Sequence, residues 1–403
     1  MIRSLFCIAA AAMSGLALGQ SHIIARLHNP ADAAAVGQTF GITLRDQTEN
    51  APFAYYEAPT GSNLEAIEHA MKLDSRVVWA EDEHDTSLPE SEGGGKGGTI
   101  AAIGNRELLY TYNSNAFKQI SFDRTVAETQ VRPVRVAVLD MGISILQPSI
   151  WSRVVASKNF VEKGQTASDW PRHKDTNGNG IFDEALGHGT MVAGLIYQLA
   201  PMAQIINAKI ADTDGYSSAW LITKGLAFAV NNGAEIANIS LGAANEIPAL
   251  DDVMEWAIEE HNMAVVAPIG NNGSSMCLSP ANLSGVTCVS GLSPNDRKAP
   301  FSNWANDADV SAPATGVRSF NYDGRMAYWS GTSFAAPMVT AAAANGLYHR
   351  TTPVNARELV STIHNAGDTL VNTLNPLYTG KMGLRLNCRR LLLRIAAMRQ
   401  FGH

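Results

Sequence analysis

Short apolar runs alternate with helix-like stretches through the middle of this 403-residue chain. The apolar runs, each as long as a buried strand, cover residues 134–139, 205–210, 236–240 and 264–267. The helix-like stretches between them cover residues 190–199, 218–231 and 249–262. Buried strands that alternate with helices predict an α/β fold with a mostly parallel central sheet and helices on both faces. Ligands bind such sheets beyond the carboxyl ends of the strands, where Asp140, Ser240 and Asn271 would lie.

Composition agrees with a large globular core. Of the residues, 46% are hydrophobic and 17% are charged, which is enough apolar material for one large domain and a smaller one. The net charge of −7 argues against a nucleic-acid-binding surface.

Residues 1–19 have the pattern of a secretory signal peptide. Arg3 precedes an apolar run over residues 5–18, and the small residues Ala17 and Gly19 follow the pattern of a cleavage site. This run and all later apolar segments are shorter than a transmembrane span requires. We therefore expect an exported protein, secreted or periplasmic, with no transmembrane span.

Residues 20–85 read as a separate α+β domain. The pattern predicts strands over residues 22–27, 53–56 and 77–80, and helices over residues 31–36 and 63–73. A domain of this size behind a signal peptide is compatible with a propeptide. An accessory domain that is retained in the mature protein remains open.

The rest of the chain divides into a linker, a large domain and a tail. Residues 86–104 are acidic and then glycine-rich, so we expect a mobile, easily cut linker. The large domain should cover residues 105–387. Residues 388–403 form a basic tail with leucines at helical spacing, which favours a docked terminal helix over a membrane-surface anchor. Cys277 and Cys288 are close enough in sequence for a local disulfide, with Cys388 left over.

Ser333 has the setting of a nucleophile. It lies in Gly331-Thr332-Ser333-Phe334-Ala335-Ala336-Pro337, where small residues lead into an alanine-rich helix and proline is tolerated only in the first turn. A serine hydroxyl is a weak nucleophile unless a base removes its proton, so a histidine and an orienting carboxylate are required elsewhere.

Both partners are present. His188 lies in Gly187-His188-Gly189-Thr190-Met191-Val192-Ala193-Gly194, and Asp140 ends the apolar run 134–139 before Met141-Gly142. The three motifs are far apart in sequence, so only a folded domain brings them together. An aspartate, a histidine and a serine in such motifs predict nucleophilic acyl transfer.

These three motifs, in the order Asp, His, Ser, resemble the signatures of the subtilisin-like serine proteases, or subtilases. The resemblance covers roughly residues 105–387 and departs from the usual pattern at Met141, where the family has Thr or Ser. It implies that Asp140, His188 and Ser333 form a catalytic triad. It also makes residues 20–85 similar to the inhibitory propeptides of this family.

The resemblance assigns further residues to substrate handling. Gly215-Tyr216-Ser217 and Ser240-Leu241-Gly242 resemble the two segments that pair with an extended polypeptide substrate as added β-strands. Asn271 aligns with the family's oxyanion-hole asparagine. Pro268-Ile269 replaces a smaller pair, so the first specificity pocket should be narrow.

One loop has part of a calcium-binding pattern. Side-chain oxygens stand at loop positions 1, 3, 5 and 9, with glycine at position 6, but Leu186 replaces the final glutamate. The four residues concerned are Asp175, Asn177, Asn179 and Asp183. A turn rich in Asp and Asn that leads to His188 explains the pattern better, and a weak structural Ca²⁺ site remains open.

The sequence therefore predicts an exported serine endopeptidase that needs no organic cofactor, binds extended polypeptides and is held inactive by its own propeptide. Two alternatives come from other classes. A non-catalytic binding module would be expected to lack one of Asp140, His188, Ser333 or Asn271. A transpeptidase or cyclase would use the same acyl-enzyme, and product masses with and without an added amine would distinguish it from a hydrolase.

Overall fold

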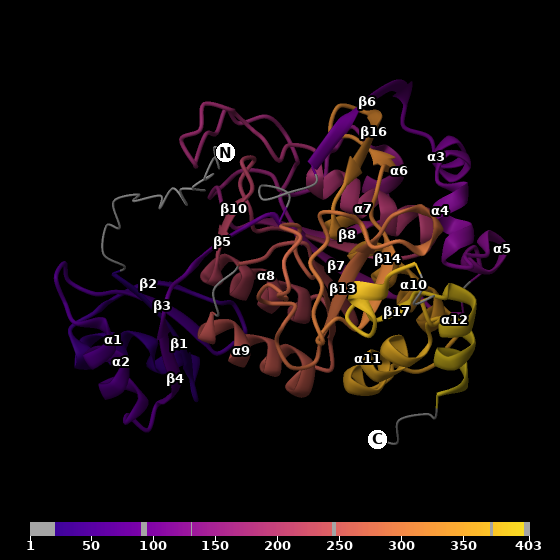
Figure 1. Ribbon diagram of the computed structural model, residues 1–403. Coiled ribbons are helices and arrows are strands. Elements are labelled where there is room, and N and C mark those ends of the chain that lie inside the picture. Colours follow the sequence, from indigo (N-terminus) through magenta and orange to yellow (C-terminus); the bar gives the residue numbers. More distant parts are fainter. Residues whose placement is uncertain (1–20, 90–94, 130, 244–246, 371–373, 399–403) are drawn as a thin grey trace, which may run out of the picture. The chain divides into compact units, whose positions relative to one another are not determined.

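The computed structural model describes residues 21–89, 95–129, 131–243, 247–370 and 374–398 (Figure 1). The predicted signal peptide lies outside these residues. The chain divides into two compact units, of which the first comprises Met1–Gln47 and Pro52–Glu83 and the second Thr48–Ala51 and His84–His403. The first unit therefore ends at Glu83, two residues before the boundary expected from the sequence.

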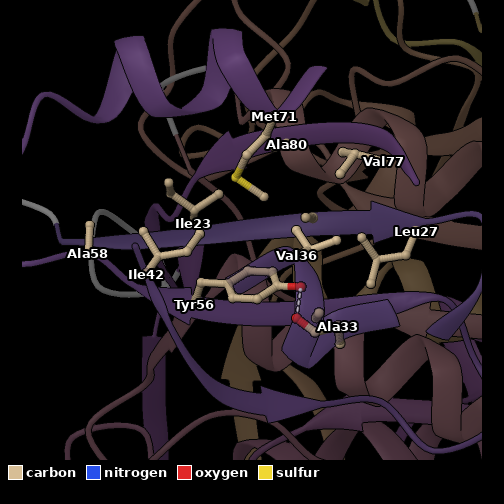
Figure 2. Packing of buried hydrophobic residues seen from close by; sticks show 12 residues of the cluster. Ile23, Leu27, Ala33, Val36, Ile42, Tyr56, Ala58, Met71, Val77 and Ala80 are labelled. Carbon is tan, nitrogen blue, oxygen red and sulfur yellow. Dashed lines mark hydrogen bonds between the residues drawn. The ribbon is translucent and has the colours of Figure 1, made fainter. Parts of the chain in front are cut away.

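The first unit is a small α+β domain with its own core. Its four antiparallel strands, in the order β2-β3-β1-β4, carry two helices. The elements are β1 (His22–Leu27), α1 (Ala33–Phe40), β2 (Thr43–Gln47), β3 (Phe53–Glu57), α2 (Leu64–Lys72) and β4 (Val77–Asp82). Figure 2 shows its buried side chains, among which the Tyr56 hydroxyl donates to the Ala33 carbonyl oxygen at 3.0 Å. The predicted strands and helices of this unit are present, and β2 was not predicted.

The second unit is built on an eight-stranded parallel sheet, in the order β17-β14-β13-β12-β11-β7-β9-β8. Its strands are β7 (Arg135–Asp140), β8 (Val154–Asn159), β9 (Gln204–Lys209), β11 (Ile236–Ile239), β12 (Ala264–Pro268), β13 (Val286–Leu292), β14 (Val310–Pro313) and β17 (Leu384–Arg385). Residues 136–140 of β7 are all buried, so both faces of this strand are covered. The α/β class predicted from the sequence is confirmed.

Two groups of helices pack on this sheet. The first consists of α7 (His188–Leu199) and α10 (Ala336–Tyr348), which also pack on each other, and the second of α8 (Ala219–Asn231) and α11 (Ala356–Asn365). Helix α9 (Pro248–Glu255) packs on α8. Shorter helices are α3 (Arg106–Tyr112), α4 (Ser114–Gln119), α5 (Arg124–Ala127) and α6 (Pro148–Trp151). The π-helix Trp256–Glu260 extends α9.

Two small sheets involve the segment predicted to be a linker. Strand β5 (Asp85–Ser87) pairs with β10 (Tyr216–Ser218), and β6 (Gly95–Ile103) joins β15 (Val317–Phe320) and β16 (Arg325–Ser330) in the order β15-β16-β6. The expectation of a mobile linker is therefore wrong for its described residues. Their backbone groups pair with strands that come much later in the sequence.

The glycine run in β6 suits this pairing. A Cβ atom at Gly97 would lie 2.2 Å from the ring of Tyr328 on the neighbouring strand, so the aromatic ring needs a residue without a side chain beneath it. Glycine covered by a cross-strand aromatic side chain is a known way to stabilise a weak strand.

The tail forms helix α12 (Cys388–Ala397), which packs on α10. Leu391 and Ile395 are fully buried, and a Cβ atom at Gly346 of α10 would lie 2.6 Å from Ile395. The described part of the tail is thus a docked helix. No helix among the described residues is both long and apolar enough to cross a membrane.

Candidate active site

Asp140 and His188 meet at the carboxyl edge of the sheet. Asp140 is the last residue of β7, and His188 is the first residue of α7. The His188 Nδ1 atom lies 2.9 Å from Oδ1 and 3.1 Å from Oδ2 of Asp140, and both side chains are fully buried. The Met141 N–H also donates to Asp140 Oδ1, at 2.8 Å. The carboxylate is thus held in place to orient the imidazole ring.

Glycines permit this close approach of α7 to β7. A Cβ atom at Gly189 would lie 2.2 Å from the Gly142 carbonyl oxygen and 3.0 Å from Asp140 Oδ1. Gly142 itself has φ of +100°, and a Cβ atom there would lie 2.6 Å from the Ala167 carbonyl oxygen. The spacing of glycines around Asp140 and His188 therefore has a steric cause.

A second buried carboxylate fixes the start of α7. Asp169 accepts hydrogen bonds from the Gly187 N–H at 3.1 Å, the Thr190 N–H at 3.2 Å and the Thr190 hydroxyl at 2.6 Å. Free N–H groups at a helix start are well satisfied by a carboxylate. Burial raises the pKa of Asp169, and these hydrogen bonds oppose that rise.

Lys209 holds the backbone that follows Asp140. Its ammonium group is buried and donates to the carbonyl oxygens of Met141 at 2.7 Å and Ala211 at 3.1 Å. The net pKa of Lys209 lies below its ordinary value, because the effect of burial exceeds the opposing effect of the negative charges of Asp169 and Glu162. Sequence reasoning missed Asp169 and Lys209, because neither lies in a motif and only their burial marks them.

Ser333 lies in a buried 3₁₀ turn, Thr332–Phe334, directly before α10. The Phe334 ring lies 5.2 Å from the His188 ring, measured between centroids, and the Trp329 ring lies 5.8 Å from it. The Ser240 hydroxyl donates to the Ser333 carbonyl oxygen at 3.3 Å. The structure therefore brings the turn that carries Ser333 beside the imidazole of His188.

Asn271 is tied to the same turn. It follows β12, is 1% exposed, and its Oδ1 atom accepts from the Thr332 N–H at 2.8 Å and the Thr332 hydroxyl at 2.9 Å. These two bonds fix the orientation of the Asn271 side chain, with its Oδ1 atom toward Thr332. Its neighbour Asn272 is exposed, and its Oδ1 atom accepts from the Ser274 hydroxyl at 2.7 Å.

The two segments expected to bind substrate pair with an extended strand of the chain itself. Ser87 of β5 lies opposite Tyr216 and exchanges two backbone hydrogen bonds with Gly242, at 2.9 and 3.2 Å. The Leu88 N–H donates to the Gly215 carbonyl oxygen at 3.0 Å. Ser240 and Leu241, which precede Gly242, are fully buried. Residues 85–88 therefore lie between the two segments as a middle strand.

Strand β6 begins beside the residues that lead into the Ser333 turn. Gly95 pairs with Ser330 and Lys96 with Trp329, three and four residues before Ser333. The Lys96 ammonium lies 5.1 Å from the centroid of the Trp329 ring. The net pKa of Lys96 lies below its ordinary value, because the effect of burial exceeds the opposing effect of the negative charges of Asp169, Asp183 and Glu184.

The loop with the calcium-like pattern is held by its own hydrogen bonds. The carboxylate of Asp175 accepts from the N–H groups of Asn179 and Gly180, and Asn179 Oδ1 accepts from the Ile181 N–H. Asp183 instead accepts from the N–H groups of residues 172, 173 and 174.

Those bonds offset the effect of burial on Asp183. Burial raises the pKa of Asp183, but the hydrogen bonds it accepts, including one from Thr213, bring the net pKa below its ordinary value. Among the described residues, the one cluster of three acidic side chains with converging oxygens is Glu68, Glu81 and Asp82 in the first unit. The Ca²⁺ site at Asp175, Asn177, Asn179 and Asp183 stays a prediction.

Of the three cysteines in the described residues, two are close together. The sulfur atoms of Cys277 and Cys288 lie 2.6 Å apart. Cys388 is buried in the first turn of α12, and burial raises the pKa of its thiol.

Together these features define a parallel α/β protein with a buried aspartate–histidine pair beside a serine at a helix start. Residues 132–378 match the model of the subtilase family, Peptidase S8. That match covers more than half of the chain, which therefore belongs to the subtilase family.

Curated relatives match the same region. The chain is 32% identical over 209 residues to a thermophilic serine proteinase of Bacillus sp. (strain AK1), a match that covers 52% of this chain and 51% of that one. It is 34% identical over 220 residues to subtilisin BL of Lederbergia lenta, covering 52% and 75% of the two chains. The chain thus spans about half the length of the first of these relatives.

A solved structure matches a larger part of the fold. Fervidolysin from Fervidobacterium pennivorans, described as a keratinolytic enzyme related to subtilisin, superimposes with a TM-score of 0.72. The match covers 93% of this chain and 61% of fervidolysin, at 18% sequence identity, so it supports the fold alone.

Proposed function

We propose that this chain is an exported serine endopeptidase that hydrolyses peptide bonds through Asp140, His188 and Ser333. The observation that carries the proposal is the buried Asp140–His188 pair, with Nδ1 2.9 Å from Oδ1, beside the turn that carries Ser333. Membership of the subtilase family, whose relatives include serine proteinases, supports the same activity.

In the proposed mechanism, the Ser333 hydroxyl attacks the scissile carbonyl carbon while Nε2 of His188 takes the hydroxyl proton. Asp140 holds the imidazole with Nδ1–H toward the carboxylate and stabilises the imidazolium ion that forms. The tetrahedral intermediate collapses when His188 passes its proton to the leaving amine. In the second half of the reaction, His188 takes a proton from a water molecule, which attacks the acyl carbonyl carbon. His188 then returns the proton to the Ser333 oxygen as the acid product leaves.

The oxyanion of the tetrahedral intermediate needs hydrogen-bond donors that are already in place. We assign this role to the side-chain amide of Asn271 and the backbone N–H of Ser333. The two hydrogen bonds from Thr332 to Asn271 Oδ1 fix the amide group from behind. Asn271 therefore would not need to reorient when the oxyanion forms.

We further propose that the substrate binds as an extended strand between Gly215-Tyr216 and Ser240-Leu241-Gly242. The chain's own residues 85–88 lie between these two segments. Ser87 exchanges two backbone hydrogen bonds with Gly242, and the Leu88 N–H donates to the Gly215 carbonyl oxygen. This observation supports a precursor in which residues 20–85 and the segment that follows act as an intramolecular inhibitor. Removal of the segment by a cut between residues 85 and 99 would open the cleft.

Fluorophosphonate labelling followed by peptide mapping tests the proposal. We expect label on Ser333 and none on Ser333→Ala, which should accumulate as an unprocessed precursor that begins near Gln20. Loss of labelling in His188→Ala and Asp140→Ala, with little further loss on combining them, is expected because the triad acts as one unit. Labelling that persists in Ser333→Ala would refute the assignment.

A further inference from the structure

Leu278 lies where the substrate side chain next to the scissile bond would enter the protein. We infer that Leu278 fills this pocket and restricts cleavage to peptide bonds that follow a small residue such as alanine or glycine. The inference rests on the proposed peptidase function and assigns the substrate class of the same site.

The register of the bound segment locates the pocket. Ser87 pairs antiparallel with Gly242, so the next two residues run back past Leu241 and Ser240. If a bound substrate keeps this register, its residue at the place of position 89 comes opposite Ser240, whose hydroxyl donates to the Ser333 carbonyl oxygen. A substrate residue at that place has its carbonyl group next to Ser333. We call it the acyl-side residue.

Two wall segments border the place where its side chain must enter. One is Ser240-Leu241-Gly242, which pairs with the substrate strand, and the other is the end of β12 with Gly270, directly before Asn271. If the carbonyl oxygen of the acyl-side residue points to Asn271, its side chain lies between these two walls. Gly242 and Gly270 have no side chains of their own, so they leave room there.

Leu278 occupies that room. A Cβ atom at Gly270 would lie 2.7 Å from both Cγ and Cδ1 of Leu278, and a Cβ atom at Gly242 would lie 3.0 Å from its Cδ1. The same side chain therefore touches both walls. It is 1% exposed.

The backbone holds Leu278 in this position. Its N–H donates to the Ile269 carbonyl oxygen at 3.1 Å, and the next residue, Ser279, exchanges two hydrogen bonds with Ala243, at 2.9 and 3.0 Å. Residues 278–279 thus bridge the two walls at the base of the pocket. While these bonds hold Leu278 in place, its side chain leaves no room for an aromatic one.

The segment that occupies the cleft in the precursor agrees with this restriction. The same register assigns Pro89, which is buried, to the acyl-side position, and its ring is far smaller than the side chain of phenylalanine or tyrosine. The narrow pocket expected from Pro268-Ile269 thus has a different cause in the structure. Leu278, ten residues further on, supplies the bulk.

Two peptide substrates that differ only at the acyl-side residue, alanine or phenylalanine, test the inference. Both carry leucine at the preceding position, as the chain itself does at Leu88. For the processed wild-type enzyme we expect kcat/KM to be on the order of 100-fold higher for the alanine peptide, the size of discrimination that hydrophobic pockets achieve. In Leu278→Gly we expect this preference to vanish through faster cleavage of the phenylalanine peptide.

The ratio of the two kcat/KM values does not depend on the fraction of folded enzyme, so a destabilised variant remains informative. Leu226→Ala, which removes a fully buried leucine from α8, is the matched control and should keep the wild-type ratio. Wild-type enzyme that cleaves both peptides equally, or an unchanged ratio in Leu278→Gly, would overturn the inference and leave the peptidase function standing. Absence of both cleavage and fluorophosphonate labelling would overturn both.

Discussion

The two hydrogen bonds between Thr332 and Asn271 give a prediction that separates catalysis from stability. Asn271→Leu removes the proposed oxyanion donor and also the acceptor of the Thr332 N–H and hydroxyl. A donor that meets only the developing oxyanion should change kcat and leave KM nearly unchanged. The expected loss in kcat is about 10²–10³, the loss that removal of an oxyanion-hole asparagine causes in subtilisin.

The same variant should lose stability. Thr332 is fully buried, so its two donors would find neither Asn271 nor water. Each buried donor left without an acceptor costs about 1–3 kcal/mol, so we expect the free energy of unfolding to fall by about 2–6 kcal/mol. Urea unfolding of this variant in the Ser333→Ala background avoids self-digestion and measures that loss.

Three controls assign the effects. Asn272→Leu alters an exposed neighbour and should lower kcat less than about tenfold, since it removes no oxyanion contact. Thr332→Val removes the hydroxyl that holds Asn271, whereas Thr332→Ser keeps it. We expect a lower kcat in the valine variant and near wild-type kcat in the serine variant. Equal losses at Asn271 and Asn272, or a rise in KM with unchanged kcat, would refute the assignment.

Three further predictions concern stability. Asp169→Ala should lower the free energy of unfolding by about 3 kcal/mol or more in urea melts, because three buried donors lose their acceptor, whereas Asp175→Ala should change it little. Burial, together with the charges of Asp82 and Glu81, raises the pKa of Glu68 from 4.5 to about 7. The stabilisation that protonated Glu68 contributes to the folded state is therefore fully present below pH 4.5 and is lost as the pH rises through 7. Glu68→Gln should therefore slow hydrogen exchange in the first unit at pH 8 and leave it unchanged at pH 4. If a Ca²⁺ ion binds the loop at Asp175, adding Ca²⁺ should raise the melting temperature of wild type but not of Asp175→Ala; an equal rise in both would exclude this site.

Much of the fold, and the motifs that form the candidate site, could be predicted because each depends on local sequence. Buried parallel strands need continuous apolar runs, and the glycines next to Asp140 and His188 are required by the close approach of Gly189 to Gly142. Such local constraints leave visible patterns. The strands predicted over residues 134–139, 205–210, 236–240 and 264–267 correspond to β7, β9, β11 and β12 to within one residue at each end, whereas β8, β13, β14 and β17 were not predicted.

The features that were missed depend on residues far apart in the chain. The segment around β5 and β6 has the composition of a linker, and it forms strands only because residues 216–218 and 325–330 offer unpaired edges. Leu278 is one leucine among many, and its role follows from two glycines that belong to different strand ends. Asp169 likewise lies in no motif. No local pattern marks these contacts.

The strand that occupies the cleft is covalently attached, and this sets the concentration against which any external peptide must compete. A tethered segment faces its site at an effective concentration in the millimolar range when its linker is short. An external peptide at micromolar concentration would therefore be displaced almost completely by residues 85–88. One cut between β5 and β6 would leave β5 covalently attached only to the part of the chain that precedes it, and the concentration of that separated piece is then that of the protein in solution. If residues 85–88 act as the proposed inhibitor, dilution after the cut favours release of the strand, and a single cleavage followed by dilution would suffice to open the cleft.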